Sequence, residues 1–243
     1  REKLDDFTAN LYGVRVGGPI IKDKLFFFVN AEVQREEEPR PFESDIYNGD
    51  SSIAEINTLR DNIINTFNYN PGGYENTITK LNSEKFTIKL DYNLDDKNTI
   101  TAKHNYVKGE SISPSQSNNR NINFANAGIF FPSETNFSTL EWNTNNDKNL
   151  SNNLILSYTS VNDNRDPIGS PFPRVQINDG DGRITFGSEA FSTANILEQN
   201  IFTVTNNFEV SKGAHNMTFG GNFENCAIRN VFVRQNYGQY TFD

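Results

Sequence analysis

KFTIKLDYNLDDKNTITAKHNYVK, residues 85–108, is the stretch that decides the fold. In its first run, apolar residues such as Phe86 and Ile88 occupy every second position, and polar residues lie between them. A period of two is typical of a β-strand whose two faces meet different surroundings. The polar residues 95–98 end this run, and the alternation returns after them, interrupted by His104. The stretch therefore predicts a β-hairpin.

The same pattern, two alternating runs around a short polar turn, occurs three more times. The other turns lie at residues 17–24, 147–151 and 211–215. Gly17-Gly18-Pro19 is expected to end the first run, because proline cannot donate a ladder hydrogen bond. The sequence thus predicts about eight strands of roughly 8–11 residues in four hairpins. The expected strands are residues 8–16, 24–34, 85–94, 99–108, 136–145, 152–161, 201–210 and 215–224.

Much longer stretches separate one hairpin from the next, at residues 36–84, 108–135 and 163–197. A transmembrane β-barrel has this asymmetry, with short periplasmic turns and long extracellular loops. Within the first long stretch, residues 53–67 carry a helical stripe of apolar residues. Ser52 and Glu55 have the spacing of a capping box, so a short helix is expected to begin there.

The composition excludes several other classes of protein. The 243 residues are 35% hydrophobic but 12% aromatic, too aromatic for a disordered chain. A net charge of −9 argues against a nucleic-acid partner. No apolar run reaches the roughly 18 residues of a transmembrane helix, and one cysteine, Cys226, allows no intrachain disulfide. These features fit a wide barrel that meets lipid on one face and water on the other.

The alternation can be oriented by directing the apolar faces toward lipid and the short turns toward the periplasm. Aromatic residues then fall at two levels, as the interfacial girdles of a barrel require. His104 and Asn206 fall on the lipid side against this pattern, and a bulge or a register shift would redirect them. The inner level holds Tyr92, Trp142 and Phe208, and the outer level holds Tyr106, Tyr158 and Phe223.

The run YGVRVGGPIIKDKLFFFVNAE, residues 12–32, resembles the first periplasmic hairpin of Oar-like TonB-dependent receptors. These receptors are outer-membrane barrels of Gram-negative bacteria, many with a carboxypeptidase-regulatory-like domain at the N-terminus. Residues 90–107, 186–208 and 212–224 match the family's pattern in the same order, so the resemblance covers nearly the whole chain.

The resemblance implies that residues 1–243 are an early part of one barrel domain of about 22 strands. The plug, the TonB box, the first strand and the later strands would lie outside these residues. The implied partners are outer-membrane lipid, the TonB energy-transducing complex acting through the plug, and an unknown extracellular ligand. A surface lipoprotein or another envelope subunit is a further candidate partner.

Parity with the lipid face predicts which side chains point into the lumen. For the charged residues, the alternative to contact with a ligand is a hydrated barrel wall, whose side chains pair with one another or with the plug. For Phe26 and Phe28, near the periplasmic rim, a plug could cover the rings, and the alternative is a strand buried on both faces of a soluble sheet. The lumen-facing candidates are Phe26, Phe28, Lys89, Asp91, Lys103 and Glu141.

The sequence offers little catalytic or metal-binding chemistry. NDGDGRI at residues 178–184 resembles a calcium loop. Alignment with an EF-hand-type loop, however, puts Ile177 and Ser188 at the two positions that need oxygen-rich ligands. A turn-rich external loop is therefore favoured, and a looser calcium site stays open. His104 and His215 have no zinc-site spacing, and no nucleophile elbow or phosphate-binding loop occurs. We expect no catalytic residue, no metal ligand and no cofactor.

A TonB-dependent outer-membrane receptor or transporter is the leading hypothesis, with ligand capture by the long loops and gated uptake. One rival is an outer-membrane barrel that serves adhesion or holds surface proteins. The other is a secreted β-rich module that binds or hydrolyses carbohydrate, which would fold in water without detergent.

Overall fold

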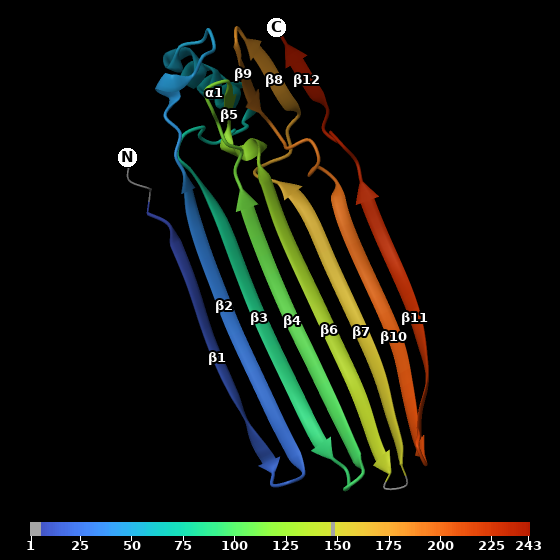
Figure 1. The fold of residues 1–243 in the computed structure, drawn as a ribbon. Helices are drawn as coiled ribbons and strands as arrows, with labels where there is room; N and C mark the ends of the chain where they lie inside the picture. Colours follow the sequence, from blue (N-terminus) through green and yellow to red (C-terminus); the bar gives the residue numbers. More distant parts are fainter. Residues whose placement is uncertain (1–5, 147–148) are drawn as a thin grey trace.

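The computed structural model describes residues 6–146 and 149–243, and its main feature is one long antiparallel sheet (Figure 1). Eight strands lie side by side in chain order, β1-β2-β3-β4-β6-β7-β10-β11. This confirms the predicted strands and hairpins. The strands are β1 (Thr8–Ile21), β2 (Leu25–Arg40), β3 (Thr77–Asn93), β4 (Asn98–Ser113), β6 (Ile129–Asn146), β7 (Leu150–Pro167), β10 (Asn195–Lys212) and β11 (His215–Phe232).

The short turns lie together at one end of the sheet, which we call the turn end, and the long connections lie at the other, the loop end (Figure 1). Between β3 and β4, the carboxylate of Asp95 accepts hydrogen bonds from the backbone N–H of Lys97 at 2.8 Å and of Asn98 at 2.9 Å. Between β10 and β11, Gly213 has a φ of 61°, which suits the first position of a two-residue hairpin turn. The predicted turn at 147–151 joins β6 to β7, and residues 147 and 148 lie outside the described residues.

The predicted strand lengths were wrong, because the strands contain 14 to 18 residues. Every strand except β1 continues toward the loop end after its apolar alternation stops. Backbone pairing needs no apolar side chains, and charged side chains pair across the strands there. Arg35 contacts Glu84 at 2.6 Å, and Lys80 contacts Glu37 at 2.6 Å.

Gly17-Gly18-Pro19 does not end β1, contrary to the prediction. The three residues pair with Phe28, Phe27 and Phe26, and the register shifts only between Pro19 and Ile21. The reason is that β1 is an edge strand, where a missing backbone N–H can face away from the ladder. The turn itself is reduced to residues 22–24.

Within the described residues the sheet is open, since β1 and β11 each pair with a neighbour on one side only. Over the same residues, no helix has the length and the apolar character needed to span a membrane.

The long connections fold together into a second unit at the loop end, which we call the cap (Figure 1). A small mixed sheet with the order β12-β8-β9-β5 takes its strands from two connections and from the segment that follows β11. The cap has its own apolar core, in which Ile56, Ile122 and Phe124 are fully buried. Its elements are η1 (Ser44–Ile46), α1 (Ile53–Phe67), β5 (Asn121–Asn123), η2 (Ala125–Ala127), β8 (Arg174–Asp179), β9 (Gly182–Phe186) and β12 (Gln239–Phe242).

Helix α1 confirms the predicted range and the predicted capping box. The Ser52 side chain accepts a hydrogen bond from the Glu55 backbone, and the Glu55 carboxylate accepts one from the Ser52 N–H at 2.8 Å. Hydrogen bonding to Ser52 lowers the pKa of Glu55. Ile56 and Ile63 face the core of the cap, and Asn68 ends the helix with a φ of 51°.

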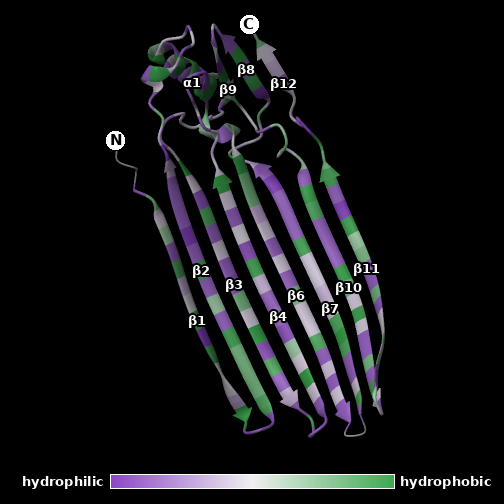
Figure 2. Cartoon of the chain, viewed as in Figure 1, coloured by the Kyte–Doolittle hydropathy of each residue, from purple (hydrophilic) through white to green (hydrophobic). Residues whose placement is uncertain are grey.

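The two faces of the large sheet differ in polarity, and hydrophobic and hydrophilic residues alternate along its strands (Figure 2). Direct partners on successive strands share a face, and we call such a series a cross-strand row. One row contains Phe27, Leu90, Ala102, Leu140 and Leu156. We call the face that carries this row the apolar face and the opposite face the polar face.

From β4 to β11, the outer aromatic residues lie progressively nearer the turn end than the row that starts at Tyr106. The row through Tyr106 passes through Ser160 and Ala227, whereas Tyr158 and Phe223 lie two and four residues nearer the turn end. At ~3.4 Å per residue and ~4.8 Å between strands, four residues over four strand spacings is a slope of roughly 35°. If the outer aromatic residues lie at one membrane level, the strands are tilted by roughly that angle, close to the ~35–45° of outer-membrane barrels. The inner level shows a smaller displacement, since Tyr92 and Trp142 share one row.

Candidate functional site

All six residues predicted to face the lumen lie together on the polar face, in two adjacent cross-strand rows. Phe28 is opposite Lys89, which is opposite Lys103. In the neighbouring row, Phe26 is opposite Asp91, and Thr101 connects Asp91 to Glu141. A line of paired strands thus joins residues that are up to 115 positions apart in the sequence.

Asp91 organises the charged half of this site. Its carboxylate contacts the Lys89 ammonium at 2.9 Å and accepts a hydrogen bond of 2.7 Å from the Thr101 hydroxyl. Lys103 lies directly opposite Lys89, although like charges at opposed positions of a sheet repel one another.

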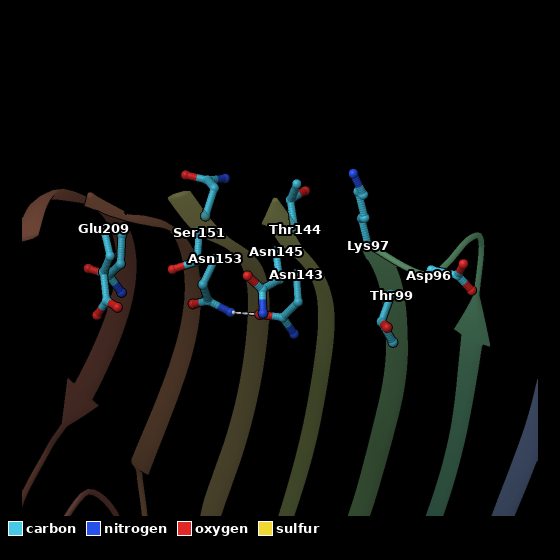
Figure 3. Close-up of a pocket in the computed structure, with 11 residues that line it drawn as sticks. Asp96, Lys97, Thr99, Asn143, Thr144, Asn145, Ser151, Asn153 and Glu209 are labelled. Carbon is cyan, nitrogen blue, oxygen red and sulfur yellow. Dashed lines mark hydrogen bonds between the residues drawn. The ribbon is translucent and has the colours of Figure 1, made fainter. Parts of the chain in front are cut away.

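Glu141 belongs to a second cluster, in which the partners are amides. Its carboxylate accepts hydrogen bonds from the side chains of Asn143 at 2.8 Å and Asn153 at 2.7 Å. The Asn153 amide also donates to the Asn143 carbonyl oxygen at 2.7 Å (Figure 3). Neutral donors therefore compensate the charge of Glu141.

The Asn143 and Asn153 amides line a polar hollow of about 430 Å³ at the turn end (Figure 3). Its walls offer amide, hydroxyl and carboxylate groups, which can exchange hydrogen bonds with a polar ligand or with water. The lining residues are Asp96, Lys97, Thr99, Asn143, Thr144, Asn145, Ser151, Asn152, Asn153, Asn207 and Glu209.

Phe26 and Phe28 stand out because they are aromatic residues on the polar face. Their direct partners are Asp91 and Lys89, and Phe28 is 37% exposed. Large apolar side chains next to charges gain stability when another surface covers them.

His104 and Asn206 stay on the apolar face, and the structure shows neither the bulge nor the register shift considered for them. Strand β4 pairs continuously on both sides of His104. The imidazole Nδ1 lies 2.8 Å from the Ser138 hydroxyl, its direct partner on β6. A local hydrogen bond thus satisfies the ring where it is.

Within the cap, Asp179 connects the β8–β9 hairpin to the segment that precedes α1. Its side chain is 8% exposed and accepts hydrogen bonds from the Tyr47 hydroxyl at 2.9 Å and the Ser51 hydroxyl at 2.8 Å. The Ser51 backbone N–H adds a third hydrogen bond at 3.1 Å. Burial is the main cause of the raised pKa of Tyr47, and the hydrogen bond to Asp179 is the second.

The calcium-like sequence at 178–184 forms the turn of this hairpin, as a turn-rich loop would. Asp179 already binds Tyr47 and Ser51, and Gly180 makes the turn with a φ of 56°. Across residues 6–146 and 149–243, no group of three or more His, Cys, Asp or Glu side chains is placed to hold a metal ion.

The sequence reasoning missed two features of the site. Asn143 and Asn153 are direct partners on β6 and β7, whereas a hairpin centred on the predicted turn at 147–151 would have placed Ile155 opposite Asn143. The contact of Tyr47 with Asp179 spans 132 residues and has no local sequence signal.

A family model for the outer membrane beta barrel domain matches residues 1–44 and 50–243. The chain belongs to the outer membrane beta barrel domain family. This barrel domain is therefore a component of the Gram-negative outer membrane. The localisation argues against the rival of a secreted, water-soluble module.

The solved structures contain a similar fold. The crystal structure of the outer membrane transporter YddB from Escherichia coli matches this barrel domain with a TM-score of 0.62 and 11% identity. The match covers 92% of this chain and 26% of that transporter, so the chain spans about a quarter of its length. At this identity the likeness shows the fold. A search of curated proteins found no match.

Proposed function

We propose that this barrel domain is part of the wall of a TonB-dependent receptor that takes up a ligand across the outer membrane. The observation that carries the proposal is the combination of a two-faced sheet with a cap at one end only. A wall that is apolar on one face and polar on the other separates lipid from an aqueous passage. The likeness to an outer-membrane transporter and the resemblance to Oar-like receptors support this choice.

In this proposal the turn end lies in the periplasm and the cap lies outside the cell. The polar face lines the passage, so Phe26, Phe28, Lys89, Asp91, Lys103 and Glu141 point into it. The two phenylalanines lie near the turn end, where a plug would cover them and where the TonB complex would act on that plug. The proposed role is transport without catalysis.

The orientation can be tested by labelling cysteines in intact cells. In a Cys226→Ser background of the full-length protein, Asp181→Cys in the cap should react with a membrane-impermeant maleimide. Asp96→Cys at the turn end should react only after the outer membrane is permeabilised. Both positions are exposed, so a reversed pattern would place the cap in the periplasm and overturn the proposal.

Uptake can be tested by comparing the producing bacterium with a strain that lacks the gene. Isotope-labelled peptides, oligosaccharides and metal chelates serve as the three ligand panels, each with and without an uncoupler of the proton gradient. We expect uptake of one panel to depend on both the gene and the gradient. Unchanged uptake of all three, with loss of other surface proteins from the mutant, would instead support the scaffold role.

A further inference from the structure

Lys103 is a positive charge on the polar face that has no partner within the described part of the sheet. Lys89 and Lys103 oppose one another on β3 and β4, and Asp91 forms an ion pair with Lys89 at 2.9 Å. In residues 6–146 and 149–243, no side chain forms an ion pair or a hydrogen bond with the Lys103 ammonium. The sheet therefore retains an uncompensated cation beside a second one, an arrangement that costs stability.

The next acidic residue does not correct this imbalance. The direct partner of Lys103 on β6 is Thr139, and Glu141 lies diagonally, two residues further along the strand. Two amides, from Asn143 and Asn153, already bind the Glu141 carboxylate.

The row that contains the two lysines carries positive charge on β3 and β4 and negative charge on β11. Glu224 on β11 lies at the far end of the row, and three neutral hydroxyl residues separate it from Lys103. An anion at this level of the wall is therefore attracted to β3 and β4 and repelled from β11. The full row reads Gly17, Phe28, Lys89, Lys103, Thr139, Ser157, Thr203 and Glu224.

We propose that Lys103 and Lys89 bind an anionic group, a carboxylate or a phosphate, of the molecule that this barrel takes up. The inference rests on the proposed function, in which the polar face lines the passage. Lysine ammonium groups act as point charges and accept either kind of anion. The Thr139 hydroxyl lies next to Lys103 in the row, and Phe28 next to Lys89 offers an apolar contact for the rest of the ligand.

The test uses the full-length protein in detergent, with inorganic phosphate and citrate as the two probes. An amine-acylating reagent read out by mass spectrometry should modify Lys103 and Lys89 less when either probe is present than in chloride of equal ionic strength. Lys85 is the internal control, because it lies on the same face of β3 and, within the described residues, also forms no ion pair, but an opposite charge, Glu32, lies across from it in place of a second lysine. Equal modification of Lys103 with and without the probes would overturn the site.

Calorimetric titration of the same probes then measures the contribution of each charge. Lys103→Gln should weaken binding at least about tenfold, since a charge-assisted hydrogen bond is lost. Lys103→Arg should retain most of the affinity, and Lys85→Gln should leave it unchanged. Lys103→Gln also removes the repulsion from Lys89, so the melting temperature should not fall. An unchanged affinity of Lys103→Gln would contradict the proposal.

The outcomes separate this proposal from the proposed function. Protection of Lys103 from acylation before any anion is added would show that a protein segment covers it, and would overturn the ligand site. Probe-dependent protection together with uptake that needs no proton gradient would support the anion site and contradict TonB-dependent transport. Gradient-dependent uptake that Lys103→Gln leaves unchanged would support TonB-dependent transport and contradict the anion site.

Discussion

Replacing Leu90 with arginine tests which face of the sheet meets the hydrocarbon. Leu90 is the middle member of an apolar series that runs from Phe86 on β3 to Leu94, the residue directly after that strand. Eight residues at ~3.4 Å each, tilted by roughly 35°, cover roughly 22 Å along the membrane normal. This height is close to the apolar band of outer-membrane barrels, ~25 Å tall. Leu90 then lies roughly 11 Å from either boundary, too deep for an arginine side chain to reach water easily.

Leu90→Arg should therefore lower the free energy of unfolding by ~2–4 kcal/mol, the cost of arginine at the bilayer midplane. The matched control is Ser157→Arg, on the polar face next to Leu156 of the row that contains Leu90, where an aqueous passage should tolerate the charge. Urea unfolding of the full-length protein in lipid vesicles measures both variants. If Ser157→Arg is the more destabilising of the two, the faces have been assigned the wrong way round.

Three further predictions concern the cap and the turns. Asp179→Ala removes the acceptor of the partly buried Tyr47 and Ser51 hydroxyls, at ~1 kcal/mol per hydrogen bond, and should speed hydrogen exchange in the cap, whereas the exposed neighbour Asp181→Ala should not. Ile56→Ala should destabilise the cap by ~2–5 kcal/mol, seen as proteolysis of the cap while the barrel strands persist; equal loss of both would show that they do not unfold separately. Hydrogen bonds from the backbone of Lys97 and from Asn98 hold the pKa of Asp95 below its ordinary value. The β3–β4 turn should thus keep its full stability above that ordinary value and lose it as the pH falls through the lowered pKa, which NMR titration of the Asn98 amide would follow.

The hairpins and the helix could be predicted because local residues determine them. Apolar alternation, the polar turn at Asp95 and the capping box of Ser52 and Glu55 are all readable within a few positions. Because the alternation also assigned residues to faces, Lys89 and Lys103 were placed correctly on one face before their pairing was known.

The strand ends and the cap could not be predicted in the same way. Pairs such as Arg35 with Glu84 extend the strands through polar sequence, which reads locally as loop. The small sheet depends on partners from distant segments, such as Tyr240 opposite Val175, and neither segment carries a strong strand pattern. The buried contact of Tyr47 with Asp179 is a product of that tertiary assembly.

The separate origin of the cap strands has a consequence for the order of folding. Strand β5 pairs with β9, β8 pairs with β12, and each pair joins segments far apart in the sequence, so the cap has a high contact order. Such contacts form slowly until the intervening chain is already held in place. The large sheet must therefore assemble first, and the cap closes only over hairpins that are paired in the correct register. With the cap outside the cell, as proposed, its protease resistance would accordingly report on whether the barrel wall beneath it has folded correctly.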